Sequence, residues 1–499
     1  MAQTSSLQEF GKNRFNLRHS RLDSFNYGYA YPIDWQRIRI GDTLHNDIDV
    51  FIRSSALVDP SFLDSDISVG HYFVPYNDID PLYESRMRKF KGLTTDQEFP
   101  SVTWSKGSLY ANESIAGLTN CFAASSLMDR LGFSLSQKQT APVNGVLKHD
   151  LSPLLAYHLI VDKFFTNTHV QDNQYTHEWI LKNIVPAAYS PALDCTLLLD
   201  EQESHEVPVW DPAGTKNFYA LRPINYLPDY FTSSRPSRTG PTVAVPTTTI
   251  PNLLDAMLMQ KVADMLNKGG FSYDDYIRVL FNEEVVNAES REPIFLGGST
   301  GPIQVSTVVN TASDLGAQGG TIAGSAGHSN GFTHTFTAEG IYMALLFIRP
   351  RTYYTHSIRT EFREFSAARR VIPQLADTQN APIYKSEITG LLPDAIGDFA
   401  TSNVSGPVTG VFGFKDRYEE YRTRYNTVHS DMRTLRTGWY IGRDYRIPYI
   451  GQEFLSIPGQ LKYTPWVVQD ETEDHFFARC SMDMELTTLL PAVSRPYVW

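Results

Sequence analysis

Alternating apolar and polar residues toward the two ends of the chain predict β-strands. In the segment that starts at Asp47, the residues Ile48, Val50 and Ile52 occupy every second position, and Phe51 shares the other side with charged residues. Because successive side chains of a strand point to opposite faces, this spacing indicates one buried face and one solvent-facing face. The same alternation predicts strands at Tyr31–Ile40, Asp47–Ala56, Ile67–Tyr76 and His475–Leu490. Two further strands are predicted, one in the continuous apolar stretch at Ile341–Pro350 and one at Gly438–Arg446.

Helical spacing dominates the middle of the chain. Ser152 and Pro153 form a favourable helix start, with serine as the N-cap and proline at the first helical position. Similar start and stop signals predict two further helices, at Leu253–Lys268 and Tyr273–Asn282. Two segments rich in Pro, Gly, Ser and Thr are predicted to be ordered but irregular loops, Arg235–Pro251 and Gly297–Gly331.

Strands at both ends, with helices and long loops between them, are explained most simply by one β-barrel that its first and last strands close. We therefore predict a mainly β fold: a single eight-stranded antiparallel jelly roll with long insertions that contain several α-helices. A division into two domains near residues 150 and 340 is the alternative, but no linker composition supports it. The expected organisation is an N-terminal arm at 1–28 and one jelly-roll domain at 29–499, with main insertions at about 77–340 and 352–436.

The composition is that of a globular protein. The chain has 499 residues, of which 42% are hydrophobic and 20% charged. Its longest apolar stretch, Ile341–Ile348, is too short to span a membrane, and its first residues lack the apolar segment of a signal peptide. We therefore expect no membrane insertion and no secretion by that route. Three widely separated cysteines indicate folding in a reducing cytoplasm, namely Cys121, Cys195 and Cys480.

The charge balance is acidic, with 43 basic and 55 acidic residues and a net charge of −12. A protein that coats DNA by itself usually carries a basic excess, so if this chain encloses a genome, a small basic protein, polyamines or metal ions must help to neutralise the phosphates. Basic residues near the N-terminus are interleaved with apolar ones, which suits contact with nucleic acid, although a solvated terminal arm is an equal alternative. The candidates for this contact are Lys12, Arg14, Arg18 and Arg21.

The segment Gly410–Tyr425 concentrates aromatic rings and arginines. Rigid rings and planar guanidinium groups give large contact areas at low entropy cost, so this composition favours a packed protein–protein interface. The alternative is that its arginines pair with Glu419 and Glu420 inside one chain. The candidates for subunit contact in this segment are Phe412, Phe414, Arg417, Tyr418, Tyr421 and Arg422.

No catalytic motif is recognisable, and we predict that the chain is not an enzyme and has no organic cofactor. Gly297–Gly301 lacks the Lys-Ser/Thr of a phosphate-binding loop, and no G-x-S-x-G nucleophile motif occurs. Asp59, Asp64 and Asp66 could hold a structural divalent cation such as calcium, and a solvated turn is the alternative. The competing function is a jelly-roll protein that binds or cleaves carbohydrate, which would need exposed aromatic rings beside paired carboxylates.

Several segments occur in a distinctive order from about residue 30 to 490: Gly41-Asp42, Phe73–Pro75, Leu154–Phe165, Asp229–Ser233, Glu292–Gly298, Gly410–Tyr425 and Trp439–Tyr445. Together they resemble the major capsid proteins of microviruses, which are small single-stranded DNA phages, with the gokushovirus-like branch included. The resemblance adds Asp229, Tyr230, Phe231 and Trp439 to the candidates for subunit contact.

The resemblance implies a self-assembling T=1 icosahedral shell around a circular single-stranded DNA genome, with the arm at 1–28 on its inner surface. It also implies an internal scaffolding protein, a minor pilot protein, a small basic DNA-binding protein and a host-cell receptor as partners. The expected location is the virion, assembled in the bacterial cytoplasm. The long family insertion after Gly240–Pro246 is missing, so receptor contact is predicted at other loops, Leu198–Tyr219 or Gly316–Gly331.

Overall fold

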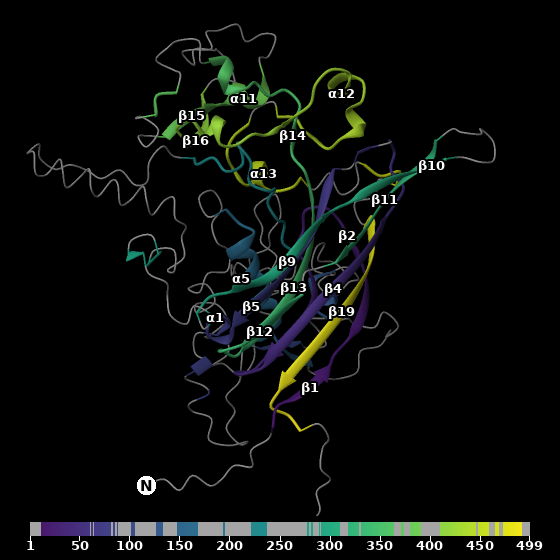
Figure 1. Cartoon of the computed structure of the whole chain (residues 1–499), viewed down its shortest axis with the longest axis vertical. Helices are drawn as coiled ribbons and strands as arrows, with labels where there is room; N and C mark the ends of the chain where they lie inside the picture. The colour runs from purple at the N-terminus through teal and green to yellow at the C-terminus, as the bar shows by residue number, and fades with distance from the viewer. Residues whose placement is uncertain are drawn as a thin grey trace, which may run out of the picture.

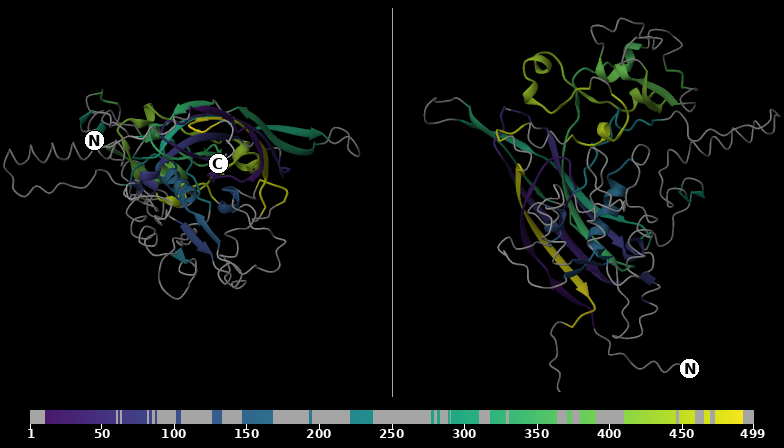
Figure 2. Two further views of the ribbon diagram at one scale, coloured as in Figure 1. Left: turned by 90° about the horizontal axis from the view of Figure 1, so that it is seen from below. Right: turned by 180° about the vertical axis from the view of Figure 1, so that it is seen from behind.

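The fold is mainly β and consists of two antiparallel sheets with smaller elements attached. Figure 1 shows the whole chain, and the view from below in Figure 2 shows the strands curving around a common interior. This computed structural model describes residues 11–59, 61–62, 64–80, 83–84, 87, 101–104, 126–132, 147–167, 193–194, 221–236, 277–278, 281–282, 289, 291–309, 318–328, 331–363, 371–373, 380–390, 410–445, 448–458, 465–468 and 473–491.

The larger sheet joins the two ends of the chain. β19 (Phe476–Thr488) lies antiparallel between β4 (Thr43–Ser54) on one side and two N-terminal strands on the other. Those two strands are β1 (Asn13–Asn16) and β2 (His19–Phe25), which pair with successive halves of β19. Residues 13–25 of the predicted N-terminal arm are therefore part of this sheet.

On the side of β4 away from β19, the larger sheet continues with strands from a segment that contains many glycines. β4 pairs with β12 (Phe332–Thr335) and with β11 (Gln318–His328), and β11 pairs with β10 (Gln304–Val309). The prediction of an irregular loop at Gly297–Gly331 is therefore wrong. Glycine content suggested a loop, but β4 supplies hydrogen-bond partners that the sequence alone does not reveal. These strands also come from inside the range predicted as the insertion 77–340.

The smaller sheet has the order β3, β13, β5, β9. Its strands are β3 (Tyr31–Ile38), β13 (Gly340–Pro350), β5 (Ser65–Pro75) and β9 (Ile294–Pro302). Every residue of β5 is buried, as expected for a strand covered on both faces. Together with β4 and β19, the strands β3, β5 and β13 confirm five of the six predicted strands, whereas β9 was not predicted.

The two sheets share one hydrophobic core. Ile48, Val50 and Ile52 of β4 are buried there, as their alternation predicts, whereas Phe51 is 48% exposed on the other face. The outer face of the smaller sheet is covered by α5 (Ser152–Phe164), the helix predicted at Ser152. Its last turn brings ring contacts to β5 and β13, including those of Tyr72 with Phe164 and of Phe165 with Phe347.

A glycine marks the closest approach between β5 and β9. Gly298 is paired with Gly70, and a Cβ atom added at Gly298 would lie 2.4 Å from the carbonyl oxygen of Val69. Gly298→Ala is expected to lower the free energy of unfolding by about 1–3 kcal/mol, because the strands must separate to make room. Gly301→Ala, in the same strand, is the matched control, since its added Cβ would meet nothing within 4 Å. Equal urea unfolding midpoints for the two variants would contradict this explanation.

A buried polar network links the two sheets. Asn46 Nδ2 of β4 donates to the Tyr342 hydroxyl of β13 at 2.8 Å, and that hydroxyl lies 2.7 Å from His71 Nδ1 of β5. Burial lowers the pKa of His71 from 6.5 to about 4. A neutral imidazole can accept a hydrogen bond from the Tyr342 hydroxyl at Nδ1, so this geometry suits an uncharged His71.

This network predicts a loss of stability in acid. The unfolded chain protonates His71 below about pH 6.5, whereas the folded chain protonates it only near pH 4, so stability falls as the pH falls between these values. The expected contribution is about 3 kcal/mol. His71→Gln should therefore lose less unfolding free energy than the wild type between about pH 7 and pH 4.5 in urea titrations. Parallel losses in both proteins would rule out this role for His71.

The remaining predictions have mixed outcomes. The helix predicted at Leu253–Lys268 lies outside the described residues, and so does most of Tyr273–Asn282. The strand predicted at Gly438–Arg446 is wrong, because only β18 (Gly442–Arg443) is extended there. The helix α5 begins one residue earlier than predicted, since Asp150 rather than Ser152 accepts the hydrogen bonds at its start.

Smaller elements complete the described chain. They are α1 (Tyr76–Ile79), β6 (Ser101–Trp104), α4 (Leu127–Arg130), β7 (Leu147–Asp150), β8 (Leu193–Asp194), β14 (Tyr353–Tyr354), η2 (Thr360–Arg363), β15 (Asn380–Tyr384), α11 (Lys385–Thr389), β16 (Val411–Asp416), η5 (Glu419–Tyr421), β17 (Asn426–Thr427), α12 (Asp431–Thr434), η6 (Thr437–Trp439) and α13 (Gln452–Leu455).

Candidate subunit-contact region

Many of the residues singled out from the sequence converge on a second hydrophobic cluster. Figure 1 shows its elements, β14 to β16 and α11 to α13, gathered at one end of the molecule. Aromatic rings form much of its interior, with the ring of Phe231 4.8 Å from Tyr354 and 4.6 Å from Tyr425. The buried members of this cluster are Tyr230, Phe231, Tyr354, Ile383, Ile388, Phe412, Phe454 and Leu455.

Asp229 organises the turn that leads into this cluster. Its Oδ1 accepts hydrogen bonds from the backbone amides of Phe231, at 2.9 Å, and Thr232, at 2.8 Å. Its Oδ2 accepts from the hydroxyls of Thr352 and Tyr354, both at 2.9 Å. One carboxylate therefore joins the 229–232 turn to β14, and its function in this structure is to hold the cluster together.

A buried arginine completes the same cluster. The guanidinium of Arg443 lies 4.3 Å from the ring centroids of both Tyr226 and Phe454. It donates to the hydroxyls of Tyr354, at 3.2 Å, and Tyr445, at 2.5 Å, and to the carbonyl of Phe454. Burying a guanidinium is costly without such partners, so Arg443 fixes how these segments pack.

The aromatic–arginine segment divides into a buried part and an exposed part. Phe412 and Tyr418 are buried, and the Tyr418 hydroxyl accepts a hydrogen bond from the backbone amide of Ile372 at 3.0 Å. Phe414 is half-buried and pairs through its backbone with Arg235. Tyr230, Phe231 and Phe412 pack inside the chain, and their part in subunit contact stays a prediction.

The exposed part of that segment faces solvent. Tyr421 is 61% exposed, and Arg422 is exposed and lies 3.4 Å from Glu419 in an ion pair within the chain. Arg417 is half-buried, with its guanidinium 5.3 Å from the centroid of the Tyr418 ring. The intramolecular pairing left open by the sequence is therefore present, while Tyr421 and Arg422 stay accessible to a neighbour.

Trp439 lies beside an exposed apolar area. Its ring is 6.1 Å from that of Phe62, which is 63% exposed, and its carbonyl accepts hydrogen bonds from Ser61 Oγ and the Phe62 amide. Leu435, four residues earlier, is 73% exposed. Such side chains are typical of protein–protein contact surfaces.

The N-terminal basic residues already have partners within the chain. Arg18 forms two hydrogen bonds with Asp483, at 3.0 and 2.6 Å, and Arg14 pairs with Glu485. Arg21 lies 2.7 Å from Asp23. Lys12 Nζ donates to the carbonyl of Gly41. The structure thus places all four along the edge of the larger sheet, and their contact with nucleic acid stays a prediction.

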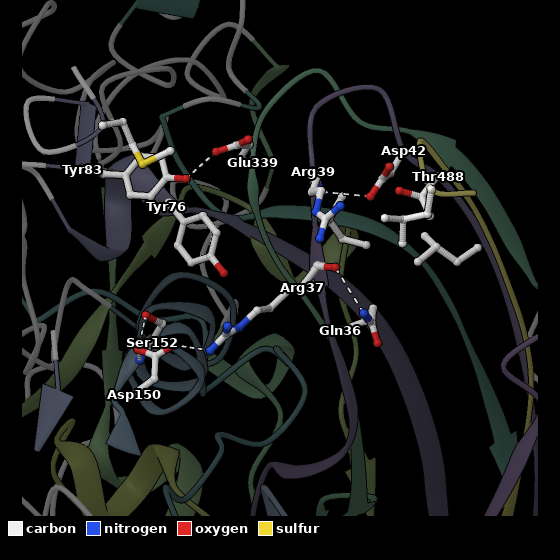
Figure 3. Close-up of a pocket in the computed structure, with 14 residues that line it drawn as sticks. Gln36, Arg37, Arg39, Asp42, Tyr76, Tyr83, Asp150, Ser152, Glu339 and Thr488 are labelled. Carbon is white, nitrogen blue, oxygen red and sulfur yellow. Dashed lines mark hydrogen bonds and ion pairs between the residues drawn. The ribbon is translucent and has the colours of Figure 1, made fainter. Parts of the chain in front are cut away.

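A pocket of about 650 Å³ opens between the ends of the two sheets. Figure 3 shows Arg37 directed at Asp150, with 2.6 Å between the paired atoms, and Tyr83 directed at Glu339. Burial raises the pKa of Tyr76 to about 12. The carboxylates in this pocket each accept a hydrogen bond from a protein donor. This is unlike the paired catalytic carboxylates that the carbohydrate-cleaving alternative requires.

Two of the three candidate cation ligands, Asp64 and Asp66, pair with an arginine. Arg351 forms two hydrogen bonds of 3.0 Å with Asp66 and lies 3.2 Å from Asp64. Over the part of the chain that the structure describes, no three His, Cys, Asp or Glu residues are grouped so that they could hold a metal. Within those same residues, no helix has the length and apolar character needed to cross a membrane.

Sequence reasoning did not include the exposed rings of the larger sheet among the candidate functional residues. Phe51 and Phe477 occupy the solvent-facing positions of β4 and β19, with 48% and 52% of their surfaces exposed. The signal was available, because an aromatic residue at a polar position of an alternating strand has no place in the core.

Known proteins similar to this chain are phage capsid proteins. The family described as "Capsid protein (F protein)" matches residues 5–248 and 242–456. Capsid protein VP1 of Bdellovibrio phage phiMH2K is 21% identical over 477 residues, which is 85% of this chain and 83% of that protein. Capsid protein VP1 of Chlamydia phage 1 is 25% identical over 217 residues, 42% of this chain and 36% of that protein. Since the family match covers most of its length, the chain belongs to the phage capsid protein (F protein) family.

Proposed function

We propose that this chain is the major capsid protein of a microvirus and that its copies assemble into a T=1 icosahedral shell around circular single-stranded DNA. As a member of a capsid protein family, it is a structural component of the virion and not an enzyme. Assembly then depends on complementary surfaces that meet around the symmetry axes of a closed shell.

The observation that carries this proposal is the strand order in the two sheets. Taken along the chain, the strands of the two sheets fall into eight positions, namely β1 with β2, then β3, β4, β5, β9, β11 with β12, β13 and β19, and β10 is an additional edge strand beside β11. Positions 1, 8, 3 and 6 are neighbours in the larger sheet, and positions 2, 7, 4 and 5 in the smaller one. This order supports an eight-stranded jelly roll, an architecture that viral capsid proteins use.

The exposed residues around the second cluster are the proposed contacts between subunits. Tyr421, Arg422, Phe62 and Leu435 combine rings, an arginine and aliphatic surface, and all are exposed. Aromatic residues and arginine are enriched where protein interfaces bury most area. In this proposal, Asp229 and Arg443 position those contacts from within the chain.

The partners follow from the charge and from the family. A net charge of −12 leaves the phosphates of a genome without compensation, so we propose that a small basic DNA-binding protein shares the particle. An internal scaffolding protein, a minor pilot protein and a host-cell receptor are further proposed partners. Assembly is proposed to take place in the bacterial cytoplasm.

Expression of the chain with the other genes of its phage tests the proposal. The expected material is a uniform, fast-sedimenting particle that negative-stain electron microscopy shows as a small closed shell. Monomers or dimers alone, with the other phage proteins demonstrably present, would overturn the proposed function. Tyr421→Ala should reduce the yield of particles while the purified subunit stays folded.

A further inference from the structure

One end of the solvent-facing side of the larger sheet carries alternating rings and guanidinium groups. In β4 these are Phe51 and Arg53, and in β19 they are Phe477 and Arg479. The register pairs Phe51 with Arg479 and Arg53 with Phe477, so each ring lies opposite an arginine. Leu22 of β2 continues the row on the far side of Arg479.

All four side chains point away from the core. Phe51 is 48% exposed, Phe477 is 52% exposed, and both arginines are exposed. The Arg53 guanidinium lies 5.2 Å from the centroid of the Phe51 ring. The two rings are diagonal neighbours on adjacent strands, which places their backbones about 7–8 Å apart.

Asp49 shares the exposed face of β4 with Phe51 and Arg53, but it forms no ion pair with either arginine of this area. Among the residues that the structure describes, no carboxylate forms an ion pair with Arg53 or Arg479. Further along β19, by contrast, the charged side chains do form ion pairs, Asp483 with Arg18 and Glu485 with Arg14. The two arginines of this area therefore have no carboxylate partner in the described part of the chain, although the chain as a whole carries a net charge of −12.

We propose that this area, made of Phe51, Arg53, Phe477 and Arg479, binds single-stranded nucleic acid. Exposed rings on a sheet stack against unpaired bases, and guanidinium groups between the rings bind the phosphates that join those bases. The inference rests on the proposed function, because it names the surface of the shell protein that meets the genome. If this area meets the genome, then this face of the larger sheet lies on the interior side of the shell.

A protein partner is the alternative occupant, because aromatic residues and arginine are also enriched at protein interfaces. In this area, however, charged groups separate the rings along each strand, so the rings form no continuous apolar surface of the kind that a protein interface buries at its centre. A single strand of nucleic acid has the same alternation, with an apolar base and an anionic phosphate in every unit.

The test measures binding of fluorescein-labelled oligo(dT) to the purified full chain over a range of salt concentrations. Phe51→Ala with Phe477→Ala should weaken binding roughly fivefold to a hundredfold for each ring that stacks. Arg53→Gln with Arg479→Gln should make the slope of log affinity against log salt shallower by about 1.4, because two phosphate contacts are lost. Phe362→Ala with Arg424→Gln is the matched control, since both residues are exposed on another part of the molecule.

Each outcome decides the matter, because sedimentation of the same preparations reports shell assembly separately. The inference is supported if both double variants lose oligo(dT) affinity as stated while the control binds like the wild type. It is overturned if the wild type does not bind oligo(dT), or if the variants bind equally well. Variants that bind normally but no longer associate with one another would identify this face as a protein contact instead. Failure of the wild type to assemble when it is expressed with the other phage proteins would count against the proposed function alone.

Discussion

Replacing Arg130 with methionine is expected to lower the free energy of unfolding by about 3–5 kcal/mol. Arg130 is 1% exposed, and its guanidinium lies 2.5 Å from Asp23 and 3.0 Å from Asp474. It also stacks 4.5 Å from the centroid of the Tyr31 ring. Methionine preserves much of the apolar contact but leaves buried carboxylates without this cation, which is why the loss is large.

The matched control for Arg130→Met is Arg37→Met. Arg37 forms an ion pair of 2.6 Å with Asp150, but its side chain is 56% exposed, so the expected loss is about 0–1 kcal/mol. Urea unfolding followed by tryptophan fluorescence measures both, and adding Asp474→Asn to Arg130→Met should restore part of the stability. Similar losses for the two methionine variants would show that burial of the Arg130 pairs contributes nothing.

Replacing Phe231 with alanine is expected to cost about 3–5 kcal/mol, because the ring is fully buried at the centre of the second cluster. The Phe231 ring contacts the rings of Tyr230, Tyr354 and Tyr425, with centroid distances of 5.1, 4.8 and 4.6 Å. Removing it therefore leaves a cavity between these rings. The measurement is the free energy of unfolding of the purified subunit.

Tyr421→Ala is the comparison that separates the core from the surface in this region. Tyr421 is 61% exposed, so its removal should change the unfolding free energy by no more than about 0.5 kcal/mol while reducing shell assembly. If Phe231→Ala left stability unchanged and blocked only assembly, the second cluster would be a subunit interface and our description of it would be wrong.

Local patterns in the sequence were sufficient for the strands that form the centre of the fold. The alternation at Ile48, Val50 and Ile52 identified β4 and its buried face, similar patterns identified β5 and β19, and a continuous apolar stretch identified β13. Their pairing could not be derived in the same way. β2 and β19 are separated by most of the chain, and local propensity carries no information about such distant partners.

Glycine-rich strands were the main failure in predicting the fold. Gly298 is required because β5 and β9 approach closely, yet glycine in a sequence normally indicates a turn. Gly438–Arg446 failed for a different reason. Arg443 is drawn inward among aromatic rings, and that contact depends on segments far away in the sequence.

The sequence was sufficient to predict which residues belong to the candidate site, but not which of them are exposed on its surface. The sequence marked Asp229, Phe231, Phe412 and Tyr421 together, and the structure brings the first three into the second cluster. Composition alone could not tell that Phe231 and Phe412 are buried and that Tyr421 is exposed. That distinction depends on the tertiary packing of several segments.

Electron cryomicroscopy of particles purified after expression with the other phage genes tests the central claim most directly. We predict an icosahedral shell with one copy of this chain in each asymmetric unit, with both sheets forming a jelly roll and with Tyr421 at a contact between subunits. A preparation in which the chain forms only monomers or dimers, although the other phage proteins are present, would contradict the assignment of this chain as a shell-forming protein.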